Sequence, residues 1–119
     1  FCIGETLKER GQKKTNQILK KQIEKGLKSI KNKSKIIIAY EPVWSIGTGV
    51  IPKEADLNKT ISFIKSRFVK KYPKILYGGS VNTNNVSILK KIASIDGFLI
   101  GGASQDPKKF IDIIKKTIN

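Results

Sequence analysis

Residues 39–50 have the sequence AYEPVWSIGTGV, and this stretch decides how the whole chain is interpreted. The β-branched run Ile36 to Ile38 leads into it and predicts a buried strand. The strand ends in the carboxylate of Glu41, and Pro42 then stops regular structure before a loop rich in glycine, serine and threonine. A carboxylate fixed at the end of a strand, beside a loop that can close and exclude water, is suited to general-base chemistry.

Strand-like and helix-like segments alternate along the 119 residues, which is typical of parallel α/β structure. We expect strands at residues 1–3, 36–40, 74–77 and 97–100. No linker or low-complexity tract separates them. Residues 1–119 are therefore predicted to form one partial domain without an internal boundary.

Apolar residues recur at helical spacing between these strands. The first of these helices is predicted over about residues 11–31. Thr6 and Glu9 have the spacing of a capping box and could open a helix nearby, and Pro107 suits the start of the last helix. The apolar residues of the predicted helices are Leu19, Ile23, Leu27 and Ile30, then Leu57, Ile61, Ile64 and Phe68, then Val86, Leu89 and Ile92, and finally Phe110, Ile114 and Ile118.

The chain is strongly basic, with 24 basic residues, 9 acidic residues and a net charge of +15. Arg10 and Arg67 are its only arginines. Because specific readers of nucleic acids favour arginine for its bidentate geometry, we expect no specific nucleic-acid partner. The lysines fall on predicted outer helix faces and indicate a solvated basic surface, while weak binding to polyanions stays open as an alternative.

Cysteine, histidine and methionine content limits the function classes further. Cys2 is the only cysteine and histidine is absent, so an internal disulfide, a metal site and a histidine-dependent triad are not expected. The lone cysteine fits a reducing cytoplasm. No apolar run approaches the ~20 residues of a membrane span, so no membrane partner is expected. Methionine is absent, and we expect a fragment or one piece of a split protein.

Residues 39–50 closely resemble the catalytic strand and lid of the triosephosphate isomerase family. The segments 77–81 (YGGSV) and 100–104 (IGGAS) resemble its two phosphate-binding turns, and residues 2–10 resemble the stretch after its fifth strand. The order and spacing of the matches agree over essentially the whole chain. The resemblance implies the C-terminal half of a (β/α)8 TIM barrel, from the end of strand 5 through helix 8, because a complete barrel needs ~250 residues.

The resemblance also implies roles for single residues. Glu41 would be the base that moves a proton between neighbouring carbons of a triose phosphate. Cys2 and Glu5 match supporting positions near the base and the lid. The residues that would hold the substrate phosphate, largely through backbone N–H groups, are Gly47, Ser80, Gly101 and Gly102. The residues that would form or support the lid are Pro42, Val43, Trp44, Ile46, Thr48, Gly49, Tyr77 and Leu99.

Two departures from the family pattern accompany these matches. The lid is shorter after Gly49 than in many members. The family also uses a Lys and a His from the first half of its barrel, and neither matching motif is present here. We therefore expect this chain alone to be inactive and to need an N-terminal half as its partner.

For the intact enzyme, the resemblance implies a cytoplasmic homodimer of glycolysis and gluconeogenesis that needs neither cofactor nor metal. Two alternatives stay open. One is a non-catalytic phosphate-binding half-barrel or inactive remnant, and the other is a basic module that binds polyanions.

Overall fold

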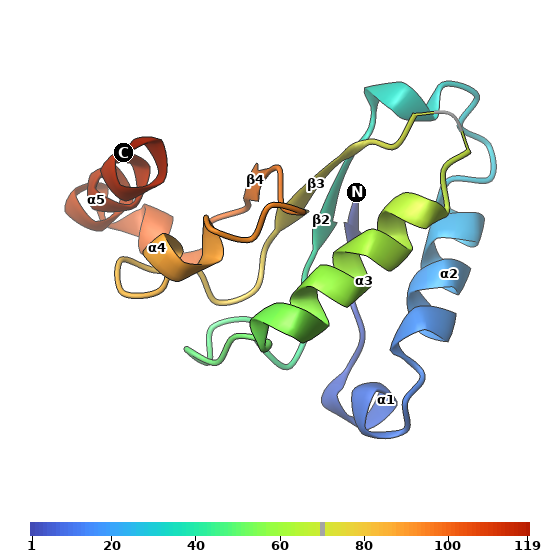
Figure 1. The fold of residues 1–119 in the computed structure, drawn as a ribbon, viewed down its shortest axis with the longest axis horizontal. Coiled ribbons are helices and arrows are strands. Elements are labelled where there is room, and N and C mark those ends of the chain that lie inside the picture. Colours follow the sequence, from blue (N-terminus) through green and yellow to red (C-terminus); the bar gives the residue numbers. More distant parts are fainter. Residues whose placement is uncertain (70) are drawn as a thin grey trace.

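The structure is a computed structural model that describes residues 1–69 and 71–119. Within these residues, four strands form one sheet in chain order (Figure 1), namely β1 (Cys2–Ile3), β2 (Ile37–Tyr40), β3 (Lys74–Tyr77) and β4 (Gly97–Phe98). Every neighbouring pair is parallel. The predicted parallel α/β class is thus confirmed, and the open sheet is consistent with part of a barrel.

Helices connect the strands, as parallel pairing requires. Between β1 and β2 lie α1 (Leu7–Gly11), α2 (Thr15–Gly26) and the short 3-10 helix η1 (Lys33–Lys35). The connection from β2 to β3 contains α3 (Glu54–Ser66), and that from β3 to β4 contains α4 (Val86–Leu89). The 3-10 helix η2 (Gly102–Gln105) and α5 (Pro107–Ile118) follow β4.

Local signals in the sequence start two of these helices. Thr6 caps α1 by accepting a hydrogen bond from the Glu9 amide, while the Glu9 carboxylate accepts one from the Thr6 amide, so the predicted capping box is confirmed. Asp106 caps α5 through the amides of Lys108 and Lys109. Pro107 occupies the first turn of α5, where a missing N–H is harmless.

The helix expected over about residues 11–31 has different ends. Lys13 adopts a φ of 58°, which breaks the helical path and separates α1 from α2. The helix then ends at Gly26, and Ile30 lies beyond it with 43% of its surface exposed. The strand expected at 97–100 is also shorter, because the register with β3 covers Gly97 and Phe98 and then ends with one hydrogen bond from the Leu99 amide to the Tyr77 carbonyl.

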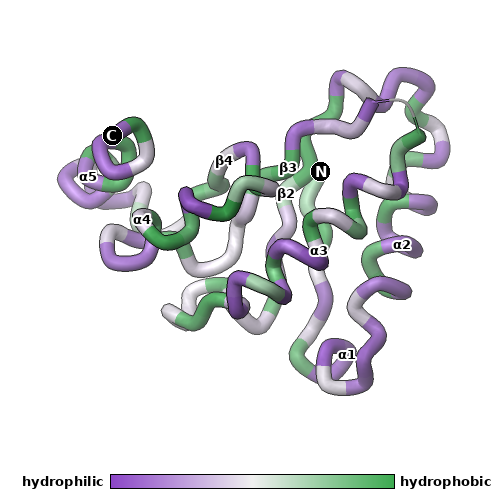
Figure 2. The backbone as a smooth tube through the Cα atoms, in the orientation of Figure 1, coloured by the Kyte–Doolittle hydropathy of each residue, from purple (hydrophilic) through white to green (hydrophobic). Residues whose placement is uncertain are grey.

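The hydrophobic core joins the sheet to helices α2, α3, α4 and α5, and Figure 2 shows hydrophilic and hydrophobic residues alternating along α2. Burial of each large apolar side chain contributes roughly 1.5–3 kcal/mol. This packing fixes the positions of β2 and β3, and therefore also the positions of the loops that follow these two strands. The fully buried residues that carry it include Ile38, Tyr40, Ile75, Tyr77, Leu19, Leu57, Ile61 and Ile64.

The side chain of Gln22, on α2, reaches the end of β1. Its amide nitrogen donates to the Gly4 carbonyl, and its amide oxygen accepts from the Gly4 N–H, both at 2.9 Å. Ile3, one residue earlier, instead accepts from the Glu41 amide of the neighbouring segment at 2.8 Å. The Gln22 side chain therefore occupies both hydrogen-bonding groups of the Gly4 main chain, its N–H and its C=O.

Helix α5 carries the predicted apolar face, but most of that face is uncovered. Ile113 is its buried residue, whereas Phe110, Ile114 and Ile118 are 37%, 40% and 78% exposed. Together with Phe98 and other residues near β4 they line an open groove of about 500 Å³. No helix in the described part of the chain is long and apolar enough to cross a membrane.

Candidate active site

Glu41 follows β2 directly, at the C-terminal edge of the sheet. Its amide donates to the Ile3 carbonyl at 2.8 Å, and the Gly78 amide donates to the Tyr40 carbonyl at 2.9 Å. Neighbouring strands thus hold the backbone on both sides of the carboxylate. A Cβ at Gly4 would lie 1.8 Å from the Glu41 carbonyl oxygen, and one at Gly78 would lie 2.7 Å from the Glu41 Cγ. Only glycine allows these close approaches.

A pocket of about 450 Å³ opens beside Glu41. Its walls come from the lid, from the turn after β3 and from the turn after β4. This volume lies within the range of small-ligand pockets. The predicted site residues that line it are Glu41, Ile46, Gly47, Ser80, Leu99, Gly101 and Gly102.

The glycine end of this pocket has an exposed backbone. Gly101 and Gly102 are exposed, and no atom lies within 4 Å of the place where a Cβ would stand on either. Gly47 is also exposed and has a φ of 70°, a conformation that favours glycine. Backbone N–H groups in such turns can bind an anion without a lysine. The arrangement therefore suits a phosphate group.

Residues 42–52 form the loop that we call the lid. Pro42 is buried at its start, and Val43 is 51% exposed. Thr48 braces the tip, because its hydroxyl donates to the Ser45 carbonyl at 3.0 Å and accepts from the Val50 amide at 3.2 Å. The Gly49 amide donates to Ser80 Oγ at 3.0 Å, which ties the lid to the turn after β3.

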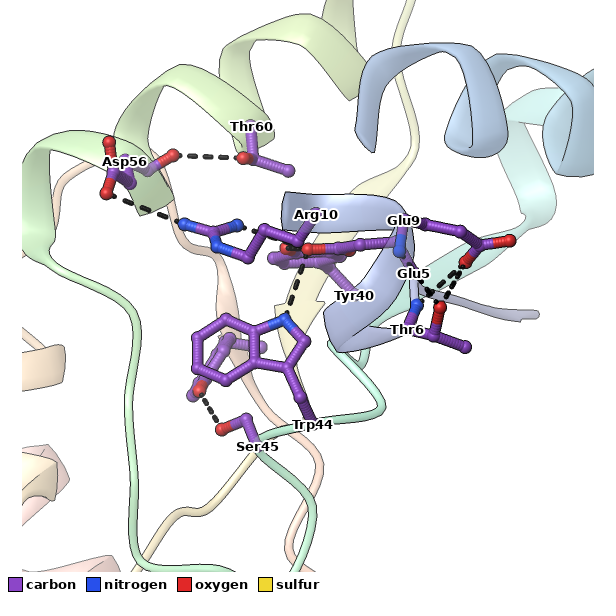
Figure 3. Close-up of polar contacts among 10 residues, drawn as sticks. Glu5, Thr6, Glu9, Arg10, Tyr40, Trp44, Ser45, Asp56 and Thr60 are labelled. Atoms are coloured by element: carbon purple, nitrogen blue, oxygen red, sulfur yellow. Dashed lines mark hydrogen bonds and ion pairs between the residues drawn. The ribbon is translucent and has the colours of Figure 1, made fainter. Parts of the chain in front are cut away.

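Trp44 anchors the first part of the lid through a buried carboxylate (Figure 3). Glu5 is fully buried and accepts hydrogen bonds from the Trp44 indole at 3.3 Å, from the Tyr40 hydroxyl at 3.1 Å and from Arg10 at 3.1 Å. Arg10 also lies over the Trp44 ring, 4.9 Å from its centroid, and reaches Asp56 at 3.5 Å. Removing a partner from such a buried carboxylate is strongly destabilising.

Two protonated groups complete this region. Burial raises the pKa of Tyr40, and the neighbouring Glu5 carboxylate raises it further, so the hydroxyl remains a donor. Hydrogen bonding to Glu41 raises the pKa of the Cys2 thiol, with burial and the Glu41 charge acting in the same direction. Cys2 is exposed and keeps its proton at neutral pH, which fits a support for Glu41 better than a nucleophile.

Among residues 1–69 and 71–119, no three His, Cys, Asp or Glu side chains form a group that could hold a metal ion. The pocket instead contains one carboxylate, that of Glu41, beside glycine turns with exposed backbone. The carboxylate can move a proton, and the turn can hold a phosphate-bearing substrate next to it.

A sequence profile of the triosephosphate isomerase family matches residues 1–117. The chain belongs to the triosephosphate isomerase family. Triosephosphate isomerase from Thermodesulfovibrio yellowstonii is 45% identical over 97% of this chain and 49% of its own length. The enzyme from Mycoplasma mobile is 46% identical over 96% of this chain and 47% of its own length. That from Debaryomyces hansenii is 42% identical over 99% and 50%. The chain thus spans about half the length of these curated relatives.

Several contacts around this triosephosphate isomerase-like pocket were not expected from the sequence. Gly4, Gly78 and Gly79 are needed because the Glu41 or lid atoms approach them too closely for a side chain. Arg10 joins segments that are far apart in the chain. The double glycine at 78–79 was the only sequence signal for these contacts, and it was interpreted as part of a phosphate-binding turn. The support of the lid by Tyr77, by contrast, was implied by the resemblance, and its hydroxyl lies 3.0 Å from Ser45 Oγ.

Proposed function

We propose that this chain is the C-terminal half of a triosephosphate isomerase, an enzyme that interconverts dihydroxyacetone phosphate and D-glyceraldehyde 3-phosphate. The chain would supply the base, the lid and the phosphate-binding turns. The observation that carries the proposal is that Glu41, Gly47, Ser80 and Gly101 line one pocket although they come from three separate loops.

In this proposal Glu41 removes a proton from the carbon next to the substrate carbonyl and returns it to the carbonyl carbon. The electron pair left behind forms an enediolate, with its negative charge on the former carbonyl oxygen. The hydroxyl proton then passes from the neighbouring oxygen to this one, through the histidine proposed below, and the return of the first proton to the former carbonyl carbon gives the isomeric sugar phosphate. Backbone N–H groups of the glycine turns hold the phosphate, so the reacting carbons stay beside the carboxylate. Ile46 and Leu99 border the same pocket as Glu41 and would exclude water when the lid is closed.

The developing negative charge on the substrate oxygens needs donors as well as a base. We propose that a lysine and a histidine of an N-terminal half supply them, and that this half pairs with the open edges of β1 and β4. Homodimerisation of the assembled barrel, a cytoplasmic location and a role in glycolysis and gluconeogenesis are further proposals that come from the family.

Reconstitution tests the proposal. The chain is mixed with the N-terminal half of one of the relatives named above, and isomerisation is followed in a coupled assay free of host isomerase. We expect negligible turnover from either half alone and clear turnover from the mixture. Glu41→Gln should lower that turnover by about 10²–10⁴-fold, because the amide cannot accept the substrate proton.

Glu24→Gln is the matched control, since Glu24 is an exposed carboxylate on α2 that forms a surface ion pair with Lys20 at 3.8 Å. It should leave turnover unchanged. Binding of the two halves is measured for each variant, so that loss of activity is separated from loss of assembly. A fully active Glu41→Gln assembly would refute Glu41 as the base.

A non-catalytic phosphate-binding half-barrel is the second candidate, because the glycine-lined pocket is formed by this chain without any partner. Titration of the isolated chain with inorganic phosphate, followed through the amide signals of Gly47, Gly101 and Gly102, distinguishes the two. Tight binding by the isolated chain together with an inactive assembly would favour this second candidate.

A further inference from the structure

Ser45 is a fully buried hydroxyl residue within the lid, and its side chain has partners on three segments. Its Oγ lies 2.5 Å from the Val50 carbonyl oxygen, at the far side of the lid tip. The same oxygen lies 3.0 Å from the Tyr77 hydroxyl, at the end of β3. It also lies 3.2 Å from the Ser80 amide, in the turn that follows. Ser45 Oγ therefore connects the two sides of the lid tip to the end of β3 and to the turn that follows it.

The available protons fix the direction of these hydrogen bonds. A serine hydroxyl has one hydrogen to donate, and a carbonyl oxygen can only accept, so Ser45 donates to Val50. The Ser80 amide is a donor and therefore donates to Ser45 Oγ. The remaining partner, Tyr77, must then donate to Ser45 as well. Burial raises the pKa of Tyr77, so its hydroxyl keeps the proton that this arrangement requires.

The same loop connects Ser45 to the base. A Cβ on Gly79 would lie 2.6 Å from Ser45 Oγ and 2.2 Å from the Tyr77 hydroxyl oxygen. A Cβ on the preceding Gly78 would lie 2.7 Å from Glu41 Cγ. The backbone of two consecutive glycines thus packs against the Ser45–Tyr77 pair on one residue and against the Glu41 side chain on the next. A shift of the lid at Ser45 would therefore displace these two glycines and, through Gly78, the Glu41 side chain.

We propose that Ser45 is a positioning residue that holds the lid closed and keeps Glu41 in place for proton transfer. The inference rests on the proposed function, since the base and the lid are defined by it. The lid is short after Gly49, and Ser45 offsets this by binding the Val50 carbonyl directly. Without the hydroxyl, Val50, Tyr77 and Ser80 lose their common partner, and the closed lid loses its link to the turn beside the base.

Fluorine NMR can detect the lid position, because Trp44 is the only tryptophan in the chain and adjoins Ser45. The chain is labelled with fluorotryptophan and assembled with an unlabelled N-terminal half, so that only Trp44 gives a signal. Spectra are recorded with and without glycerol 3-phosphate. For the wild type we expect one dominant resonance. For Ser45→Ala we expect a second resonance from an open lid and about tenfold weaker binding of glycerol 3-phosphate, given typical hydrogen-bond strengths.

Ser66→Ala is the matched control. Ser66 also donates to a main-chain carbonyl, that of Phe63 at 2.7 Å, but it lies at the end of α3 and outside the lid. Its fluorine spectrum and affinity should equal those of the wild type. In the active assembly Ser45→Ala should lower kcat by more than it raises KM, because the lost contacts position the base after the substrate is bound.

Tyr77→Phe keeps the test decisive if Ser45→Ala fails to assemble. It removes one donor to Ser45 and should produce the same second resonance with a smaller population. The double variant should resemble Ser45→Ala alone, because both changes remove one shared contact. An unchanged fluorine spectrum in either single variant would overturn the proposal. An inactive wild-type assembly would refute the proposed function instead, while the spectra would still decide the role of Ser45.

Discussion

Glycines in this chain serve two different physical purposes. At Gly4, Gly78 and Gly79 a single added carbon would stand within 3 Å of another atom, so these residues are required by packing. At Gly101 and Gly102 the same carbon would stand in open space, so packing gives no reason for glycine there. The approach of a ligand to the backbone is one physical reason for a residue without a side chain, and it agrees with the proposed phosphate site.

The two kinds of glycine should respond differently to substitution. In the assembled barrel, Gly101→Val should leave stability unchanged but weaken the binding of a phosphate-bearing inhibitor, because the side chain crowds the backbone N–H groups. Gly79→Ala should lower the free energy of unfolding by about 1–3 kcal/mol, because the methyl group collides with the Tyr77 and Ser45 hydroxyls. Urea unfolding and calorimetric titration measure the two effects. Unchanged inhibitor affinity in Gly101→Val would remove that glycine from the site.

At the scale of single residues, the sequence predicted the residues that line the pocket better than the residues that hold them in place. Glu41 and the glycine turns belong to short motifs whose spacing is visible in one stretch of chain. The contact of Arg10 with Asp56 joins residues more than 30 positions apart. Such contacts depend on how the strands are set in the sheet, which local patterns do not specify.

One carboxylate joins two elements at the opposite end of the sheet. Asp96, just before β4, accepts a hydrogen bond from the Ile75 amide of β3 at 2.9 Å, while its own amide donates to the Ile75 carbonyl at 2.9 Å. Lys74 and Lys65 lie 3.4 Å and 3.6 Å from its oxygens. Burial by itself would raise the pKa of Asp96, but the Ile75 amide and the two lysines outweigh it and hold the pKa below the ordinary value of 3.8.

The depressed pKa makes this strand connection sensitive to acid. A carboxylate with a lower pKa in the folded state stabilises the fold above its unfolded pKa, and the contribution disappears as pH falls through the folded value. The reassembled barrel should therefore lose stability below about pH 4, and Asp96→Asn should be less stable at neutral pH but lose less on acidification. Urea midpoints of both proteins at several acidic pH values check this. Parallel pH curves would contradict it.

Element types were predictable from the sequence, whereas element ends were not. The apolar period identified α2, α3 and α5 because a buried helix face leaves a local pattern. The break at Lys13 and the early end at Gly26 leave no such pattern, since they depend on a single left-handed residue and on where α2 stops packing against the sheet. β4 is shorter than its apolar run because Leu99 and Ile100 turn into the pocket wall.

The molecule as a whole is an unclosed sheet. β1 and β4 each pair on one side only, and the apolar groove beside α5 is open to solvent. Ile37 on β2 is also 53% exposed, while Ile38 on the same strand and Ile75 on β3 are fully buried. The alternation of strands and helices made the fold class predictable, but how the open edges are covered depends on atoms outside this chain.

The isolated chain should therefore be a dynamic compact species or a self-associated one, with helical circular dichroism and binding of a hydrophobic dye. Ile114→Lys, in the groove, should reduce dye binding and self-association because it places a charge on the apolar surface. Val69→Lys is the control, since Val69 is 99% exposed and outside the groove. Sedimentation and amide exchange measure the outcome. A sharply folded monomer with strongly protected strands would mean that this chain is an autonomous domain.

The amide clamp of Gln22 on Gly4 makes the two borders of the sheet unequal. Along the β1 edge, an added strand that extends to Gly4 must displace Gln22 from the N–H and C=O of Gly4. Within the described residues, no side chain forms a hydrogen bond with the main chain of Gly97 or Phe98 in β4. If copies were added edge to edge, the β4 edge of one copy would pair with the β1 edge of the next, where Gln22 already binds Gly4. We therefore expect Gln22 to disfavour the addition of further copies along the β1 edge.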